Sequence, residues 1–158
     1  DAPCGDMNWM SKIDLDGIEY IGLDIVADLI LKNQESYQKN EKVTFLLKDL
    51  TRDPLPKVDV ILNRECLVHF SYEDINRCLR NMKESQSKYL LTTTFRKLKS
   101  NHDIITGHWH AINLQKPPFN FPEPLDFLEE SCEPGTDQKL EGKGLGLWKL
   151  TDLPTLQI

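Results

Sequence analysis

Asp24, Asp49 and Asn63 each stand at or just past the end of a short apolar run that is typical of a β-strand. In an open parallel α/β sheet, ligands bind beyond the carboxyl ends of the strands, so these side chains are predicted to face one site. A carboxylate there can accept hydrogen bonds from two neighbouring hydroxyl groups, such as those of a ribose. The residue types therefore favour a nucleotide-like ligand.

The spacing of Gly5 and Asp24 supports this interpretation. Asp24 lies 19 residues after Gly5, close to the separation of about 20 residues between a first-turn glycine and the acid that holds a ribose. Asp is also a preferred residue at the start of a helix. A cap for the helix that follows is therefore the alternative role for Asp24.

The turn around Gly5 is poorly suited to phosphate. Pro3 has no N–H to donate, and the charge of Asp6 repels an anion. Neither G-x-G-x-x-G nor G-x-x-x-x-G-K-[ST] occurs in the chain, which disfavours a dinucleotide or a nucleoside triphosphate. S-adenosylmethionine carries a positively charged methionyl tail in place of phosphates, and acidic residues favour it.

The elements that position these residues alternate between β-rich and helical segments. Strands are predicted over 18–24, 43–47, 58–63 and 89–94, with helices over about 26–38 and after Ser71. This order predicts parallel strands with right-handed crossovers. Strands at 127–132 and 144–150, around the loop 133–143, are predicted to pair antiparallel. The predicted fold is α/β: a Rossmann-like, doubly wound, mostly parallel sheet in three layers, with a C-terminal antiparallel hairpin, in one domain over 1–158.

The helix after Ser71 has the clearest pattern. Ser71 and Asp74 resemble a capping box, with Asp in place of the usual Glu or Gln. The apolar residues that recur at helical spacing, and are predicted to face the core, are Ile75, Cys78, Leu79 and Met82.

Composition places the chain among soluble globular proteins. Of its 158 residues, 39% are hydrophobic and 28% are charged, which tells against intrinsic disorder. The formal charge of −6 disfavours nucleic acid as a partner. No apolar run approaches the roughly 20 residues that cross a membrane. The widely spaced Cys4, Cys66, Cys78 and Cys132 favour reduced, buried thiols and a cytoplasmic location.

These residues together resemble the class I S-adenosylmethionine-dependent methyltransferases. The family's first motif is an apolar strand ending in D-x-G-x-G-x-G, and this chain begins with the letters DAPCGDM. Asp1 and Gly5 match the motif, whereas Pro3 and Met7 replace its first and third glycines. The resemblance covers nearly the whole chain and implies that an N-terminal helix and a first strand precede Asp1.

The resemblance also implies roles for individual residues. Asp1 and Gly5 would line the methionyl end of the cofactor, and Asp24 would bind the ribose hydroxyls. Asp49 would take the adenine amino group, with Leu50 against the ring.

Asn63 would face the methionyl group or the reaction centre. Many amino-methylating members of the family carry N-P-P-Y at this point, but this chain has the letters NREC over residues 63–66. Methylation of a planar amide or an exocyclic amine is therefore disfavoured, and the predicted acceptor is an unidentified small molecule.

Methyl transfer needs few catalytic side chains, because most of the rate acceleration of an in-line displacement comes from holding the reactants close together and correctly oriented. Where the acceptor must lose a proton, His69 and Glu65 are the candidate catalytic bases, with His108 and His110 as further candidates. His69 precedes a capped helix, so a structural role is the alternative. No metal site is predicted, because no cysteine lies within 15 residues of the histidines at 102–110.

Several alternatives stay open. The aromatic segment 109–121 either walls the acceptor site or buries its own rings; its members of interest are Trp109, Asn113, Phe119 and Phe121. The basic residues between 88 and 99 are interpreted as solvated surface. The replacements at Pro3 and Met7 favour a non-catalytic methyltransferase-like module a little, whereas the retained Gly5, Asp24 and Asp49 favour an enzyme more. The absence of a phosphate loop disfavours a nucleotide-dependent oxidoreductase or sugar-modifying enzyme. A sheet without its first strand would gain from a partner strand, so an oligomer is compatible with the sequence.

Overall fold

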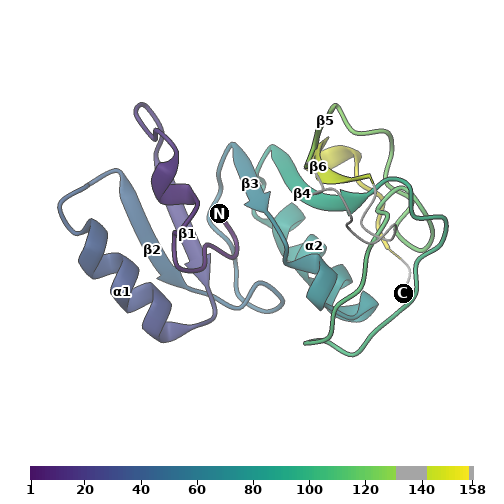
Figure 1. Cartoon of the computed structure of the whole chain (residues 1–158), viewed down its shortest axis with the longest axis horizontal. Helices are drawn as coiled ribbons and strands as arrows, with labels where there is room; N and C mark the ends of the chain where they lie inside the picture. The colour runs from purple at the N-terminus through teal and green to yellow at the C-terminus, as the bar shows by residue number, and fades with distance from the viewer. Residues whose placement is uncertain (131–141, 157–158) are drawn as a thin grey trace.

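The structure is a computed structural model that describes residues 1–130 and 142–156 (Figure 1). Within these residues the chain forms six β-strands and two α-helices. The strands are β1 (Tyr20–Asp24), β2 (Val43–Leu47), β3 (Val60–Asn63), β4 (Tyr89–Phe95), β5 (Asp126–Glu129) and β6 (Lys143–Lys149), and the helices are α1 (Ala27–Tyr37) and α2 (Tyr72–Glu84). The elements predicted from sequence are present, and most of their ends differ from the predicted ones by a residue or two. Residues 131–132, the end of the strand predicted over 127–132, lie outside the described residues.

The strands form two sheets rather than one. β1 and β2 pair in parallel, and the second sheet has the order β3-β4-β6-β5. β3 and β4 are parallel, while β6 is antiparallel to both β4 and β5. The α/β class and the predicted parallel pairs are confirmed. The predicted three-layer arrangement of a doubly wound sheet is not confirmed, because no strand among the described residues joins β1 to β3.

The first residues of the chain lie between the two sheets (Figure 1). The backbone N–H of Ala2 donates to the carbonyl of Leu62 on β3 at 2.8 Å, and the N–H of Cys4 donates to the carbonyl of Leu23 on β1 at 2.8 Å. A short extended segment therefore ties the two sheets together at the edge where the predicted site lies.

α2 packs as its sequence predicts. Its buried residues are Ile75, Cys78, Leu79 and Met82. The side chain of Ser71 accepts from the N–H of Asp74 at 3.3 Å, but Asp74 does not close the predicted capping box. Instead the N–H of Ser71 donates to the hydroxyl of Thr106 at 2.9 Å, and that hydroxyl lies 2.6 Å from Oδ2 of Asp74. Asp is one methylene shorter than Glu, and a distant loop supplies the missing acceptor.

Two apolar cores follow from the two sheets. The larger one lies under α2 and includes Phe119 and Phe121, which are buried, so this part of the aromatic segment packs its own rings. The smaller one lies under α1, where Met7, Tyr20 and Phe45 are buried. Trp109 is 44% exposed and meets the ring of Phe95 edge-on.

Three cysteines are free and buried, as predicted: Cys4, Cys66 and Cys78. Cys132 lies outside the described residues. No helix in the described part of the chain is long and apolar enough to span a membrane.

Candidate cofactor site

Asp24 and Gly5, predicted as partners from their spacing, are joined directly. The N–H of Gly5 donates to Oδ2 of Asp24 at 3.0 Å, and the N–H of Val26 donates to Oδ1 at 2.9 Å. Asp24 is 6% exposed at the carboxyl end of β1. The N-cap of α1 is Val26, so Asp24 is not the helix cap of the alternative interpretation. It anchors the first turn, and it retains lone pairs for a ligand because a carboxylate accepts about four hydrogen bonds.

Asn33 on α1 holds the next peptide unit, which follows Gly5. Its Nδ2 donates to the carbonyl of Gly5 at 2.8 Å, and the side chain is buried. Sequence reasoning missed this residue. The available signal was an uncharged polar side chain three positions after Ile30, on the stripe of α1 that faces the sheet. Gly5 is therefore fixed through both its N–H and its carbonyl.

Met7 stands where the family motif has its third glycine, and its backbone keeps a glycine-like conformation. Its φ is 62°, close to the 55° of Gly5. Left-handed φ costs a side-chain-bearing residue about 1 to 2 kcal/mol. The buried Met7 side chain places Sδ 3.1 Å from the hydroxyl of Tyr20, inside the smaller core. Packing thus offsets the strain, and Met7 adopts the left-handed conformation that a glycine adopts readily.

Asp1 presents a buried carboxylate at the start of this turn. Its Oδ2 accepts from the hydroxyl of Tyr20 at 2.7 Å. Its Oδ1 is buried and has no hydrogen-bond partner among the described residues. A buried carboxylate oxygen without a donor is costly, and a ligand that brings a cationic N–H group would remove that cost.

Asp49 follows β2 and lies at the same sheet edge as Asp24. The N–H of Lys48 donates to the carbonyl of Asp24 at 2.9 Å, which joins the two strand ends. Oδ1 of Asp49 accepts from the N–H and the hydroxyl of Thr51 at 2.9 and 2.7 Å. Leu50, predicted to pack on an adenine ring, has its side chain buried in the larger core.

Asn63, predicted to face the ligand, is fully buried and uses its amide internally. Nδ2 donates to the carbonyl of Ala2 at 2.5 Å, and Oδ1 accepts from the hydroxyl of Thr92 at 3.0 Å. It therefore ties the first segment to β3 and β4. In this geometry Asn63 positions the residues beside the site.

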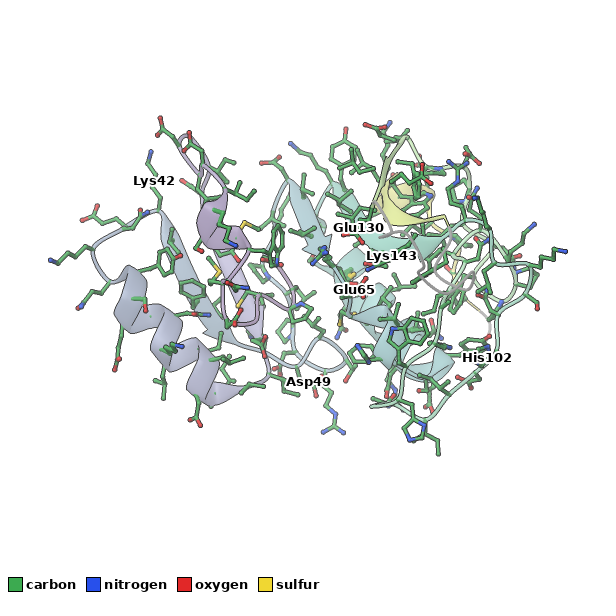
Figure 2. The ribbon with its side chains drawn as sticks, viewed as in Figure 1. Lys42, Asp49, Glu65, His102, Glu130 and Lys143 are labelled. Atoms are coloured by element: carbon green, nitrogen blue, oxygen red, sulfur yellow. The ribbon has the colours of Figure 1, made fainter. Side chains whose placement is uncertain are left out.

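The candidate base Glu65 belongs to a compact network of charges after β3. Its Oε1 lies 3.1 Å from Nζ of Lys143, which is also 3.1 Å from Oε2 of Glu130 (Figure 2). Arg64 pairs with Oε1 of Glu130 at 2.7 Å and lies over the ring of Trp9. The left-handed backbone of Glu65, with φ of 53°, directs its N–H to the hydroxyl of Thr93 at 2.9 Å.

Charges in this network balance one another. Partial burial opposes the ionisation of Glu130, but hydrogen bonds from Arg64 and Lys143 outweigh it and hold the pKa of that carboxyl below its usual value. Burial likewise opposes the charge of Lys143, but Glu65 and Glu130 outweigh it and raise the pKa of the amine. The carboxylate of Glu65 therefore faces a charged ammonium group.

The second candidate base, His69, has different partners. It lies in the 3-10 turn Leu67–His69, and its Nδ1 is 2.9 Å from the carbonyl of His108. Because a carbonyl only accepts, a neutral His69 carries its proton on Nδ1 and a lone pair on Nε2. The structure gives no hydrogen bond between His69 and Glu65 among the described residues.

Sequence comparison decides the family. The family model described as a methyltransferase domain matches residues 1–87, more than half of the chain. The chain belongs to the methyltransferase domain family. The match covers the first turn, both strands of the smaller sheet, β3 and α2, and so includes the proposed cofactor residues. No curated protein matches the sequence significantly.

Solved structures resemble this methyltransferase domain in fold. TehB from Haemophilus influenzae has a TM-score of 0.63 at 18% identity, over 93% of this chain and 55% of that one. Magnesium protoporphyrin IX methyltransferase from Synechocystis PCC 6803, with bound SAM, has a TM-score of 0.59 at 14% identity; the match covers 93% of this chain and 66% of that one. The citrinin polyketide synthase CMeT domain has a TM-score of 0.55 at 17% identity; the match covers 86% of this chain and 40% of that domain. The chain spans about half the length of most of the structures that it resembles.

Proposed function

We propose that this methyltransferase domain binds S-adenosylmethionine across the Gly5 turn and the carboxyl ends of β1 and β2. We also propose that it transfers the methyl group to a small molecule. The observation that carries the proposal is the backbone of Gly5, whose N–H bonds to Asp24 and whose carbonyl bonds to Asn33, beside Oδ1 of Asp1, which has no hydrogen-bond partner among the described residues. When bound, S-adenosylmethionine supplies an electrophilic methyl group on a sulfonium.

The charges at this edge support a cationic ligand over a phosphate. The carboxylates of Asp1, Asp24 and Asp49 all belong to the segments that meet there. A phosphate would be repelled by these groups, whereas the ammonium of a methionyl tail would complement Asp1. Asp24 would accept from the ribose hydroxyls, and Oδ2 of Asp49, 3.7 Å from Nε of Arg52, would accept from the adenine amino group. Asn63 would fix the backbone of Ala2 rather than touch the cofactor.

We place the acceptor near Glu65, where the side chains of Trp9 and Arg64 meet the charge network. Trp9 is 37% exposed and offers an aromatic face, and Arg64 and Lys143 offer donors. Glu65 or His69 would remove a proton from an acceptor that must lose one. The left-handed backbone of Met7, a conformation that glycine adopts readily, supports a cofactor-binding enzyme over a module that has lost its ligand.

Titration calorimetry tests this proposal. S-adenosylmethionine and S-adenosylhomocysteine should each bind with one-to-one stoichiometry, because both present the same adenosine and methionyl groups. NAD⁺ should produce no heat of binding, since its pyrophosphate would meet the acidic turn. Absence of heat with millimolar S-adenosylmethionine, or tighter binding of NAD⁺, would contradict the proposal.

A further inference from the structure

Arg64 directly follows β3, and two different contacts hold its guanidinium group in place. Its Nε and Nη2 lie 2.8 Å and 2.7 Å from the same oxygen, Oε1 of Glu130. Its Cζ lies 5.4 Å from the centre of the Trp9 ring, in a cation–π contact. A guanidinium group that is held at one edge and on one face is preorganised, so it loses little freedom when it binds a ligand.

These contacts use only one edge of the guanidinium group. A guanidinium has five N–H donors, and Glu130 accepts from two of them along the edge formed by Nε and Nη2. The edge formed by Nη1 and Nη2 has no further hydrogen-bond partner among the described residues. The side chain is 34% exposed. Two parallel N–H groups on such an edge match the two oxygens of a carboxylate.

Lys143, the other cation of the network, has less to offer a ligand. Its Nζ already lies 3.1 Å from Oε1 of Glu65 and 3.1 Å from Oε2 of Glu130 (Figure 2). Its side chain is 22% exposed, and an ammonium group has no planar pair of donors. Lys143 therefore neutralises carboxylates of the protein, whereas Arg64 keeps donors for a further acceptor group.

Arg64 also lies between the proposed cofactor turn and a candidate base. Trp9, which touches the guanidinium group, follows the first turn closely in sequence. Asn63, directly before Arg64, donates to the carbonyl of Ala2 in that first segment. Glu65 comes directly after Arg64. A small molecule held by Arg64 would therefore lie within reach of both the first turn and Glu65, as a displacement that depends on orientation requires.

We propose that the methyl acceptor carries a carboxylate, and that the Nη1–Nη2 edge of Arg64 binds this carboxylate while Trp9 fixes the plane of the guanidinium group. The inference rests on the proposed function, because it assigns the substrate class of the same site. The carboxylate anchors the acceptor and leaves another of its atoms for methylation. Arg64 is thus a specificity-determining residue that separates acids from their neutral analogues.

Titration of the protein with matched small molecules tests the proposal. Benzoate and pentanoate are compared with benzamide and pentanamide, which have similar shapes but no charge. The indole N–H signal of Trp9 in nitrogen-15 NMR reports binding beside Arg64, and the buried Trp148 serves as the internal reference. At least one carboxylate should shift the Trp9 signal at millimolar concentration, and its amide should bind about tenfold or more weakly. Carboxylates that leave the signal unchanged, or bind no better than their amides, would overturn the proposal.

A conservative substitution shows whether the guanidinium edge is responsible. Arg64→Lys keeps the charge but loses the planar pair of donors, so it should weaken binding of the carboxylate by about tenfold or more. Arg96→Lys is the matched control, because Arg96 also pairs with a glutamate and lies over an aromatic ring, Phe127. It should leave the affinity unchanged. Equal affinity in the two folded variants would overturn the proposal.

One readout needs no substitution. In the wild-type protein the Nε–H signal of Arg64 should move with the carboxylate, and that of Arg96 should stay in place; the opposite result would overturn the proposal even where Arg64→Lys does not fold. Titrations with and without S-adenosylhomocysteine separate this inference from the proposed function. Binding of S-adenosylhomocysteine without binding of a carboxylate at Arg64 would overturn this inference alone. Absence of S-adenosylhomocysteine binding would contradict the proposed function, while the titration without it still tests Arg64.

Discussion

The backbone N–H of Gly5 lies 3.0 Å from Oδ2 of Asp24, and this bond fixes the first turn against the end of β1. Asn33 completes the arrangement through the carbonyl of Gly5. Two buried side chains from neighbouring elements thus fix the two peptide units that flank the Cα of Gly5. The proposed cofactor site depends on this backbone staying in place, because preorganised donors and acceptors cost no reorganisation on binding.

Replacing Asn33 should weaken both stability and cofactor binding. Asn33→Ala leaves the carbonyl of Gly5 without its donor, and we expect a loss of about 1 to 2 kcal/mol in the free energy of unfolding. Urea denaturation measures that loss, and calorimetry should show weaker binding of S-adenosylmethionine. Glu35→Ala, at an exposed position of the same helix, is the matched control and should change neither. Unchanged binding of S-adenosylmethionine to Asn33→Ala would contradict the role of Asn33 in positioning the cofactor site.

Thr106 should contribute to stability although it lies far from α2 in sequence. Its hydroxyl accepts from the N–H of Ser71 and contacts Asp74. Thr106→Val keeps the shape but removes both bonds, so unfolding should become easier by about 1 kcal/mol. Thr151→Val, at an exposed position, serves as the control in the same thermal and urea measurements. Equal stability of the two variants would show that the loop does not support the helix.

Lys143 should contribute to the stability of the fold, because its ammonium group offsets the charges of Glu65 and Glu130. Lys143→Met leaves Glu65 and Glu130 without their shared ammonium, which should destabilise the fold by about 1 to 2 kcal/mol at low salt. Salt should reduce the loss, since it screens the remaining repulsion. The control is Lys149→Met at an exposed end of β6. A second substitution, Glu65→Gln, should restore part of the stability; no restoration would contradict the proposed balance of charges.

Local patterns allowed much of the fold to be predicted. The spacing of Gly5 and Asp24 predicted that both belong to one site, although not that they bond to each other. The stripe from Ile75 to Met82 faces the core as its periodicity requires. Both signals are local, or depend on a spacing that the βα unit itself sets.

Long-range partners could not be predicted from such patterns. The acceptor that Thr106 supplies to Ser71 comes from a loop 35 residues away. The internal use of Asn63 depends on Ala2, which is 61 residues away in sequence. The strand order β3-β4-β6-β5 was also not predicted, because strand patterns identify strands but not their order within a sheet.

Binding of S-adenosylmethionine to Asp24→Ala, compared with Asp28→Ala, tests the central claim most directly. Both substitutions remove one carboxylate at the start of the same βα unit, but Asp28 is exposed on α1 and Asp24 is buried against Gly5. Circular dichroism should first show that both variants are folded. We expect calorimetry to give wild-type affinity for Asp28→Ala and at least about a tenfold weaker affinity for Asp24→Ala, since a hydrogen bond to a charged group contributes about 1.5 to 3 kcal/mol. Equal affinity in the two folded variants would contradict the account.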